Sequence, residues 1–420
     1  MKKKILLHSI VFSPDGVSTA YLYNDIALEF AASGYEVVVL TTTPHYNVLP
    51  DVLATQPLKK RWAGLYYESD YQGIRVVHVP QKKFKSSLLR IFGFMYWHML
   101  SLILGLLQKN IALILSPSPP LSIGLINLLI GKLKGAKVVY NVQEIYPDFL
   151  INQGSLKLKP VISLLKSMER RVYNSSDAVT TIDAVFYDTI APRFKKRSKL
   201  HIIPNFVDTS LFKPGISSEL NQVFFPENNK VLKVMYAGNI GHAQDWAPLL
   251  YLAKELIQQA IEFWVIGEGV MKAYLEQQIS IHKLTNVHLV PYQNREQMPA
   301  LIAYADLHFI FMSPDMEGQG FPSKVYTIMA CAKPLLVMSG KDTPIHNFLE
   351  PAGCAFLADA GAFAENCKQL SAFLQIAAAN PVLLQEMGQK GHQLIEATYS
   401  NTAVTRQYVQ LATQLLNPEP

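Results

Sequence analysis

The chain alternates between β-strand and α-helix patterns, and it passes through this alternation twice. Each predicted strand is a short apolar run, and most are followed by a stretch with helical periodicity. The predicted strands of the first series are residues 5–12, 36–42, 74–79, 111–116, 137–141, 179–182 and 201–203. Those of the second series are residues 231–237, 262–266, 287–290, 307–311, 335–337 and 355–357. This order predicts an α/β protein of two domains, each a parallel sheet with crossover helices.

The boundary between the two domains is predicted within residues 205–229, where prolines and a glycine interrupt every periodic pattern. We therefore assign an N-terminal domain to residues 1–205 and a C-terminal domain to residues 206–395. Residues 396–420 are predicted to form a C-terminal helix that packs back toward the N-terminal domain. Open parallel sheets bind ligands at the carboxyl ends of their strands, so candidate site residues are expected in the loops that follow strands.

The two halves differ in net charge. Residues 1–205 hold 25 Lys and Arg against 13 Asp and Glu, a net charge of +12, whereas residues 206–420 hold 13 against 19, a net charge of −6. A basic surface indicates an anionic partner, which is a nucleic acid, a membrane surface or a phosphorylated substrate. The basic residues of the first half are spread over apolar helices and match no nucleic-acid-binding motif, so nucleic acid is not expected.

Composition favours an ordered protein of a reducing compartment. Half of the residues are apolar and 17% are charged, as in globular proteins with large cores. The three cysteines have no CxxC spacing, which argues against a disulfide framework and against a zinc site. The basic and apolar start of the chain lacks a small-residue cleavage site, and a buried first strand is favoured over a secretion signal.

Glycine turns follow the first strand of each series. Gly16 lies in the turn of the first half, Gly238 and Gly241 lie in that of the second, and Gly267 follows the next strand. A glycine turn that leads into a helix presents backbone N–H groups to an anion such as phosphate. An ordinary turn is the simpler interpretation of Gly16 taken alone. Neither turn has the GxGxxG spacing of a dinucleotide-binding fingerprint.

Two further loops carry carboxylates or a lysine at strand ends. Residues 312–330 combine Glu317, which is suited to accept hydrogen bonds from sugar hydroxyls, with Lys324, which is suited to meet a phosphate near a helix start. Glu144 follows the strand at 137–141, where a carboxylate can act as a base on an attacking hydroxyl. A helix cap or a salt bridge is an equally open interpretation of Glu144.

A basic and aromatic segment precedes the fourth predicted strand. Four cations, an apolar run over 91–107 and an aromatic anchor make up this candidate membrane or acceptor surface: Lys82, Lys83, Lys85, Arg90 and Trp97. Such a pattern is typical of a helix that lies in a membrane interface. The run is also long enough to span a bilayer, and a buried helix of the first domain is the ordinary alternative.

Several of these motifs together resemble one enzyme family. Residues 238–241, 265–269 and 317–330, with Ile203–Asp208 and Phe212, are similar to the GT-B retaining glycosyltransferases of family 4. Within that family, residues 143–148 and 322–326 resemble bacterial colanic acid transferases and the L-fucosamine transferases of O-antigen and capsule assembly. The resemblance covers nearly the whole chain.

The resemblance implies two Rossmann-like, doubly wound domains that face a central cleft. It implies transfer of a sugar, for example N-acetyl-L-fucosamine, with retention of configuration and with no metal or other cofactor. The donor would be a nucleotide sugar, UDP-linked in most relatives, and the acceptor a polyprenyl-diphosphate-linked glycan of a bacterial surface polysaccharide. The enzyme would be cytoplasmic and peripheral on the inner face of the cytoplasmic membrane.

The resemblance also assigns roles to residues. Glu144, Glu317 and Lys324 are the expected catalytic residues. The expected donor-binding residues are Gly16, Gly238, Asn239, Gly241, Gln244, Gly267, Gly320, Phe321, Pro322, Ser323 and Thr327.

The sequence departs from the family pattern at three places. Asn239 and Gln244 stand where relatives carry the Arg and Lys that hold the donor diphosphate, so Lys324 is the expected counter-charge. Thr327 or Val325 stands where relatives carry a ribose-binding glutamate. These departures keep two alternatives open, a nucleotide-sugar epimerase on the same fold and a non-catalytic nucleotide-sugar-binding subunit of a membrane assembly complex.

Overall fold

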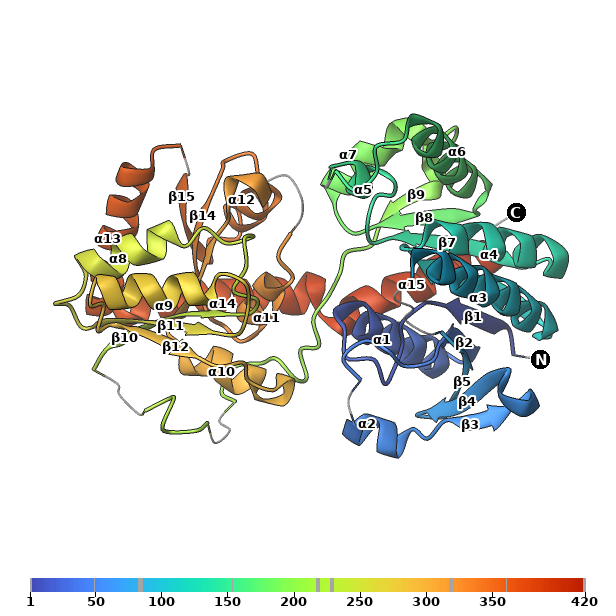
Figure 1. Ribbon diagram of the computed structural model, residues 1–420, viewed down its shortest axis with the longest axis horizontal. Coiled ribbons are helices and arrows are strands. Elements are labelled where there is room, and N and C mark those ends of the chain that lie inside the picture. The colour runs from blue at the N-terminus through green and yellow to red at the C-terminus, as the bar shows by residue number, and fades with distance from the viewer. Residues whose placement is uncertain are drawn as a thin grey trace. The chain divides into compact units, whose positions relative to one another are not determined.

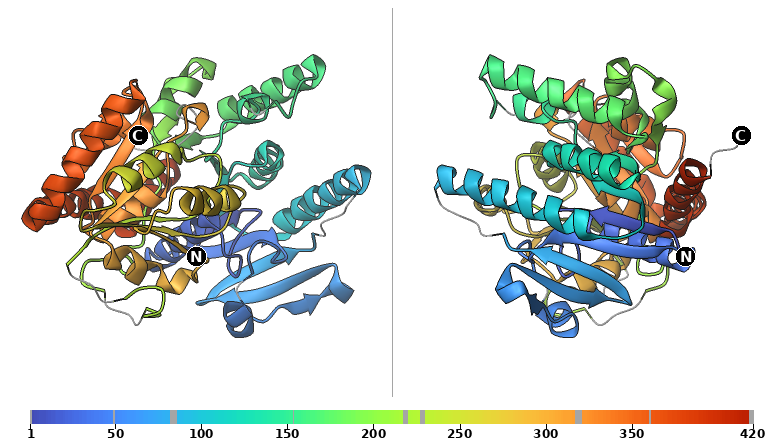
Figure 2. Two further views of the ribbon diagram at one scale, coloured as in Figure 1. Left: turned by 60° about the vertical axis from the view of Figure 1, so that its left-hand side comes forward. Right: turned by 90° about the vertical axis from the view of Figure 1, so that its right-hand side faces the viewer.

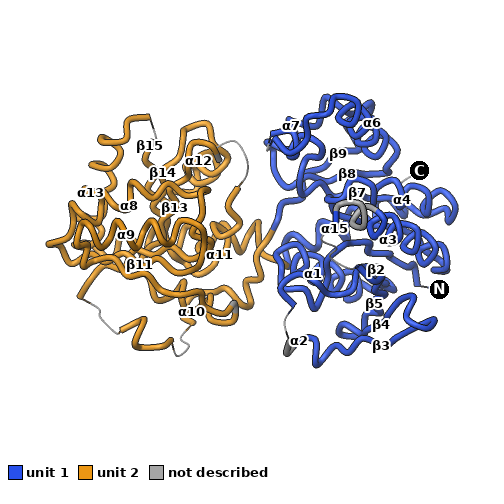
Figure 3. Tube along the Cα trace, viewed as in Figure 1, with its two compact units in different colours: residues 1–205, 402–420 blue, residues 206–401 orange. Residues whose placement is uncertain are grey.

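A computed structural model describes residues 2–48, 50–81, 86–152, 154–216, 220–226, 230–316, 321–359 and 361–417. The chain divides into two compact units, which Figure 3 colours separately. Unit 1 comprises Met1–Asn205 and Thr402–Pro420, and unit 2 comprises Phe206–Asn401. The domains assigned from sequence end at 205 and 395, so the end of unit 2 lies six residues later than the sequence assignment.

Unit 1 is built on one twisted sheet. In the described ranges it has nine strands in the order β3-β4-β5-β2-β1-β6-β7-β8-β9. Their bounds are β1 Lys4–His8, β2 Glu36–Thr42, β3 Lys59–Arg61, β4 Tyr66–Tyr71, β5 Ile74–Val79, β6 Ile111–Pro117, β7 Lys137–Val142, β8 Ala178–Thr181 and β9 Leu200–Ile202. From β5 to β9 neighbouring strands pair in parallel, and β3 and β4 extend the sheet as an antiparallel edge.

The helices of unit 1 cover both faces of this sheet (Figure 1). They are α1 Ser18–Ala32, α2 Pro50–Thr55, α3 Ser87–Leu107, α4 Leu121–Lys134, α5 Asp148–Asn152, α6 Lys159–Ser175, α7 Ala184–Ile190 and α15 Asn401–Leu416, which starts at the end of unit 2. One apolar core joins α3, α4 and α6 to sheet residues such as Leu6 and Val138. On the other face, Tyr23 of α1 donates to Asn141 at 3.0 Å, and Tyr35 bonds Thr413 of α15 at 3.1 Å.

Two features of unit 1 differ from the sequence expectation. The first strand ends at His8, four residues earlier than predicted, because the chain turns there and Ser9 bonds the main chain of Val11. The β3–β4 edge was not predicted at all. Its first strand, Lys59–Arg61, consists of three exposed basic residues, so it lacks the apolar alternation by which strands are identified.

Unit 2 is built on a smaller sheet, whose described strands all pair in parallel. The strand order is β12-β11-β10-β13-β14-β15. The bounds are β10 Leu232–Ala237, β11 Ile261–Ile266, β12 Val287–Val290, β13 Leu307–Phe311, β14 Leu335–Ser339 and β15 Ala355–Asp359. All six match the predicted strands to within two residues. Strands buried on both faces read as continuous apolar runs, which is why the sequence located them well.

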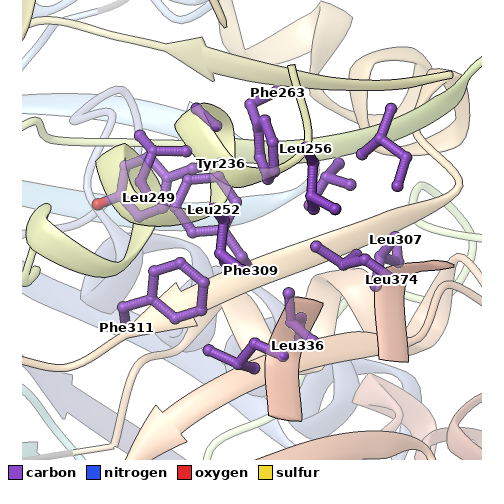
Figure 4. Close-up of a cluster of buried hydrophobic side chains, with 14 of the residues drawn as sticks. Tyr236, Leu249, Leu252, Leu256, Phe263, Leu307, Phe309, Phe311, Leu336 and Leu374 are labelled. Carbon is purple, nitrogen blue, oxygen red and sulfur yellow. The ribbon is translucent and has the colours of Figure 1, made fainter. Parts of the chain in front are cut away.

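The helices of unit 2 complete two Rossmann-like layers around this sheet. They are α8 Ala247–Glu255, α9 Lys272–Ile281, α10 Met298–Tyr304, α11 Lys324–Ala330, α12 Pro344–Leu349, α13 Phe363–Ala379 and α14 Pro381–Leu394. Figure 4 shows the main core, in which leucines of α8 and α13 pack on Phe263, Phe309 and Phe311. Among the described helices of the whole chain, none is long and apolar enough to cross a membrane.

Candidate functional site

The strand order of unit 2 reverses between β10 and β13, its central pair. Chain connections leave this point in opposite directions, β10 to β11 on one side and β13 to β14 on the other. In doubly wound sheets such a switch point opens a crevice at the carboxyl ends of the strands, where ligands bind. The loops after β10 and β13 therefore define the candidate site, and the loop after β11 lies beside them.

The glycine loops after β10 and β11 are packed backbone against backbone. Gly238 has φ 149° and Gly267 has φ 144°, in a region that side chains rarely allow. A Cβ atom on Gly267 would lie 2.0 Å from the carbonyl oxygen of Gly238, and one on Gly269 would lie 2.2 Å from that of Ile240. The Ile240 N–H donates to the Glu268 carbonyl at 2.9 Å, which ties the two loops together. Glycine is thus required here because the backbones of the two loops approach each other too closely for a side chain.

Lys324 reaches from α11 to the Gly238 turn. Its Nζ lies 3.8 Å from the centre of the Tyr236 ring and donates to the Ala237 carbonyl oxygen at 3.2 Å. A Cβ atom on Gly238 would lie 2.6 Å from the same Nζ, so the glycine leaves room for the ammonium group. Tyr236 is held in turn by its hydroxyl, which donates to the Asn239 carbonyl at 2.8 Å.

The electrostatic setting of Lys324 favours an anionic ligand. Burial lowers the pKa of Lys324 to about 7, because the ammonium group has lost most of its water. It forms no ion pair with any carboxylate in the part of the chain that the structure describes. A desolvated cation with no carboxylate partner among the described residues, beside a glycine turn at a switch point, is the arrangement expected for binding a phosphate group.

Asn239 and Gln244, which the resemblance places at the positions of the Arg and Lys that hold a donor diphosphate, differ in what they can do. The Gln244 side chain is buried, and its Oε1 accepts from the Phe311 N–H at 3.1 Å. Gln244 thereby joins the loop after β10 to the end of β13, which is a structural contact. Asn239 is exposed on the turn itself and is the residue of the two that a ligand can reach.

The segment that leads into α11 is organised by ring packing. Phe321 packs on Tyr326 and Phe348, at centroid distances of 5.1 and 5.0 Å. The Pro322 carbonyl accepts from Val325, and the Thr327 hydroxyl donates to the Lys324 carbonyl at 2.9 Å. Ser323 is exposed, and its side chain does not cap the helix.

Of the remaining predicted residues, Gly241 is buried, and its carbonyl oxygen accepts a hydrogen bond from Trp246 Nε1. Glu317 and Gly320 lie outside the described residues.

In unit 1, Glu144 lies just past the carboxyl end of β7. Its main chain is fixed by the Ser118 hydroxyl, which accepts from the Gln143 and Glu144 N–H groups and donates to the Glu144 carbonyl, at 3.0 to 3.2 Å. Partial burial raises the pKa of the Glu144 carboxyl, and a hydrogen bond from the Tyr146 hydroxyl opposes this shift. A half-buried carboxyl with a raised pKa is suited to proton transfer.

The N–H group of Gly16 is already bonded within unit 1. It donates to the carbonyl oxygens of Tyr46 and Asn47, at 3.0 and 3.1 Å. The neighbouring Asp15 carboxylate is buried and accepts from the His45 and Tyr46 N–H groups, both at 2.8 Å. A ligand at this turn would therefore have to use amides other than that of Gly16, and the approach of the turn to the donor stays a prediction.

The predicted membrane or acceptor residues separate into three groups. Lys82, Lys83 and Lys85 lie outside the described residues, and Arg90 lies in the first turn of α3. Trp97 is fully buried and packs against His8 at 5.4 Å between ring centroids. Its assignment to an exposed surface is wrong, since α3 turns Trp97 toward the core.

Two residues that support the candidate site were not predicted. Tyr236 supports the Lys324 ammonium, and Ser118 holds the Glu144 loop. The available signal for Tyr236 was that it is the one aromatic residue of its strand and lies two residues before a glycine turn. Ser118 gave no comparable signal. In the described ranges, no group of three or more His, Cys, Asp or Glu side chains is placed to hold a metal ion.

Comparison with known proteins assigns the chain to a family. Residues 19–205 match the glycosyl transferase 4-like domain, and residues 232–372 match the glycosyl transferases group 1 domain. The putative colanic acid biosynthesis glycosyl transferase WcaI of Escherichia coli K12 is 24% identical over 339 residues, 78% of this chain and 81% of WcaI. The probable glycosyltransferase WbjE of Pseudomonas aeruginosa is 24% identical over 225 residues, 52% of this chain and 55% of WbjE.

A solved structure extends the comparison to the whole fold. Anabaena Alr3699/HepE in complex with UDP-glucose superposes with a TM-score of 0.68 at 13% identity, covering 98% of this chain and 99% of that one. The fold is therefore that of the GT-B glycosyltransferases. With a 4-like domain in its first half and a group 1 domain in its second, the chain belongs to the family 4 glycosyltransferases of the GT-B class.

Proposed function

We propose that this glycosyltransferase moves a sugar from a UDP-linked donor to a polyprenyl-diphosphate-linked glycan, with retention of configuration and without a metal ion. The observation that carries the donor part is Lys324, a desolvated cation against the Gly238 turn at the switch point of unit 2. The HepE complex with UDP-glucose, which has the same fold, supports a uridine nucleotide as the carrier.

The proposed catalytic contribution of unit 2 is charge stabilisation. When the bond between the sugar and the diphosphate breaks, negative charge grows on the leaving group. A cation held in place beforehand stabilises that charge more in the transition state than in the ground state, and such terms are commonly worth 10²- to 10³-fold in rate. Lys324 needs little rearrangement to do so, because the Tyr236 ring and the Ala237 carbonyl already hold its Nζ. Glu317 is assigned to the donor sugar hydroxyls.

The proposed role of unit 1 is to bind the acceptor and to assist removal of the proton from the acceptor hydroxyl that attacks the donor. Glu144 is the candidate base or orienting group, since its carboxyl is half-buried at a strand end and its pKa is raised. In a retaining reaction the leaving diphosphate is a second candidate proton acceptor, and Glu144 would then polarise the acceptor hydroxyl.

The proposal that the enzyme acts in the synthesis of a bacterial surface polysaccharide rests on one of its relatives. WcaI is described as a putative colanic acid biosynthesis enzyme. We extend that class to this chain, with N-acetyl-L-fucosamine as the first donor sugar to test and the inner face of the cytoplasmic membrane as its place of action. The acceptor would then be presented at a lipid surface.

Donor turnover by the full chain tests this proposal. The protein is incubated in EDTA with a panel of UDP-sugars, including UDP-N-acetyl-L-fucosamine, and with undecaprenyl-diphosphate-GlcNAc or a short-chain analogue. Mass spectrometry detects an added sugar, and NMR of the product gives its anomeric configuration. Lys324→Ala and Glu317→Ala are run in parallel, with Lys254→Ala, an exposed lysine of α8, as the matched control.

The expected result is a product that forms in EDTA, retains configuration and is lost in both site variants but not in the control. Donor conversion without an acceptor would replace the proposal by a nucleotide-sugar epimerase. Tight UDP-sugar binding with no product from any donor would replace it by a non-catalytic binding subunit.

A further inference from the structure

Helix α3 exposes an apolar stripe along its length. Its large exposed side chains are Phe92, Phe94, Met95, Tyr96, Met99, Ile103 and Leu107. Phe92, Met95, Met99, Ile103 and Leu107 follow one another at intervals of three or four residues, which places them on one face of the helix. The opposite face packs on the core through Trp97, Leu100 and Leu104. Thus α3 is apolar on both sides, and only one side is covered by unit 1.

Helix α6 repeats this arrangement two helices away. Its buried residues, Glu169, Val172 and Tyr173, all lie in the C-terminal part. The N-terminal part leaves Leu158 and Leu164 more than 60% exposed, with Val161 between them. Both views of Figure 2 show α3 and α6 extending from the body of unit 1 in the same direction. Helix α4 packs against both of them and adds the exposed Leu129 and Leu133.

The charges on these segments all favour an anionic partner. Residues 86–135 contain four Lys and Arg and no Asp or Glu, and residues 154–175 contain five against one. That one acid, Glu169, is buried and paired with Arg193. The exposed charges of α4 and α6 are therefore all positive. Apolar and aromatic side chains with a basic surround are typical of protein surfaces that lie in a membrane interface.

We infer that the exposed faces of α3, α4 and α6 form one docking surface for a lipid bilayer with anionic headgroups. This inference deepens the proposed function, since it names the partner that presents the lipid-linked acceptor. Exposed apolar patches with a polar rim mark sites that bind a protein or a membrane. Nucleic acid would use the cations and leave the leucines and methionines in water. The bilayer uses both, because the side chains enter the acyl boundary while the lysines stay among the headgroups.

The test is vesicle co-sedimentation with the full chain. Vesicles of phosphatidylglycerol and phosphatidylethanolamine are compared with vesicles of phosphatidylcholine. One variant carries Phe92→Ser and Met95→Ser on α3, and a second carries Leu158→Ser and Leu164→Ser on α6. The matched control carries Val270→Ser and Ile281→Ser, two equally exposed apolar residues of unit 2. Circular dichroism and UDP binding confirm that each variant is folded.

We expect wild type and control to bind the anionic vesicles, with a partition coefficient that falls as salt is raised. Each site variant is expected to lose at least tenfold in that coefficient. Equal binding by all four proteins would overturn the inference. So would a lipid-free dimer, seen by sedimentation velocity, that dissociates in the two site variants, because the surface would then bind a second copy of the chain.

Turnover separates this inference from the proposed function. With a water-soluble acceptor analogue, the α3 and α6 variants are expected to match wild type within twofold. Loss of vesicle binding with intact turnover supports the docking surface. Vesicle binding without turnover of any donor would instead count against the proposed function alone.

Discussion

Units 1 and 2 share one architecture and differ in what they leave exposed. Unit 2 brings main chain close together at its switch point, where two glycine loops and Lys324 make a compact, polar site. In the equivalent turn of unit 1, the Gly16 amide is already bonded within the unit. Unit 1 exposes instead the apolar faces of three helices. The net charges follow this division, +12 for unit 1 and −6 for unit 2, because the C-terminal segment adds one Arg and one Glu to unit 1.

The comparison teaches that one fold can acquire different functions in two ways, through the loops that follow its strands and through the exposed faces of its helices. In unit 2 the specialised residues follow strands, at the carboxyl edge of the sheet. In unit 1 most of them lie on the solvent side of helices. Three experiments can break or sharpen this contrast.

The largest effect is expected from filling the space between the glycine loops of unit 2. Gly267→Ala would place a Cβ atom 2.0 Å from the Gly238 carbonyl oxygen, at a φ that disfavours alanine. We expect a loss of roughly 3 kcal/mol or more in the free energy of unfolding. Gly135→Ala in unit 1 is the matched control, with positive φ but no atom within 4 Å, and should cost about 1 kcal/mol. Denaturant titration measures both, and equal losses would show that the loops are not tightly packed.

A smaller effect should separate donor binding from acceptor chemistry. Lys324→Ala removes a charged hydrogen-bond donor, which is worth about 1.5–3 kcal/mol, so UDP affinity should fall roughly 10- to 100-fold. Glu144→Gln should leave UDP affinity within twofold while lowering turnover roughly 100-fold. Calorimetric titration with UDP measures the affinity, and product assays measure the turnover. If Glu144→Gln weakened UDP binding as much as Lys324→Ala, the division of labour between the units would be wrong.

The smallest effect is a pH dependence of UDP affinity. Burial holds the pKa of Lys324 near 7, whereas bound diphosphate favours the charged form. Below pH 7 the lysine is already charged and affinity is at its plateau. Above pH 7 binding must first capture a proton, so affinity should fall up to about tenfold per pH unit. Lys324→Arg, which stays charged, should flatten the profile between pH 6.5 and 8.5, and a flat wild-type profile would contradict the assignment.

The sequence predicted the fold of unit 2 better than that of unit 1. Strands such as Leu307–Phe311, in which every residue but His308 is apolar, are mainly apolar because both faces are covered, and this makes them easy to locate. The edge strand Lys59–Arg61 has no buried side chain, so its residues show no pattern from which a strand could be predicted. Its position depends on pairing with Tyr66–Tyr71, a contact that periodicity alone does not encode.

The local geometry of the candidate site could be predicted where it lies in one short motif, and could not where it depends on distant partners. Gly238, Gly267 and Lys324 lie in short motifs that already contain most of their geometry. That the Gly16 amide is already bonded could be known only from the approach of Tyr46 in the next loop. Likewise, Trp97 and Phe92 are both aromatic residues in one apolar run, and only packing decides that Trp97 is buried and Phe92 exposed.

The return of the chain to unit 1 after residue 401 makes unit 2 an insertion within unit 1. Helix α15 buries Val404, Tyr408 and Leu411, and Lys3 bonds both Leu416 and Asn417. On a ribosome, unit 2 is therefore complete in sequence before unit 1, although unit 1 begins first. Until α15 emerges, the larger sheet has part of one face uncovered, so residues 402–417 control when unit 1 can finish folding.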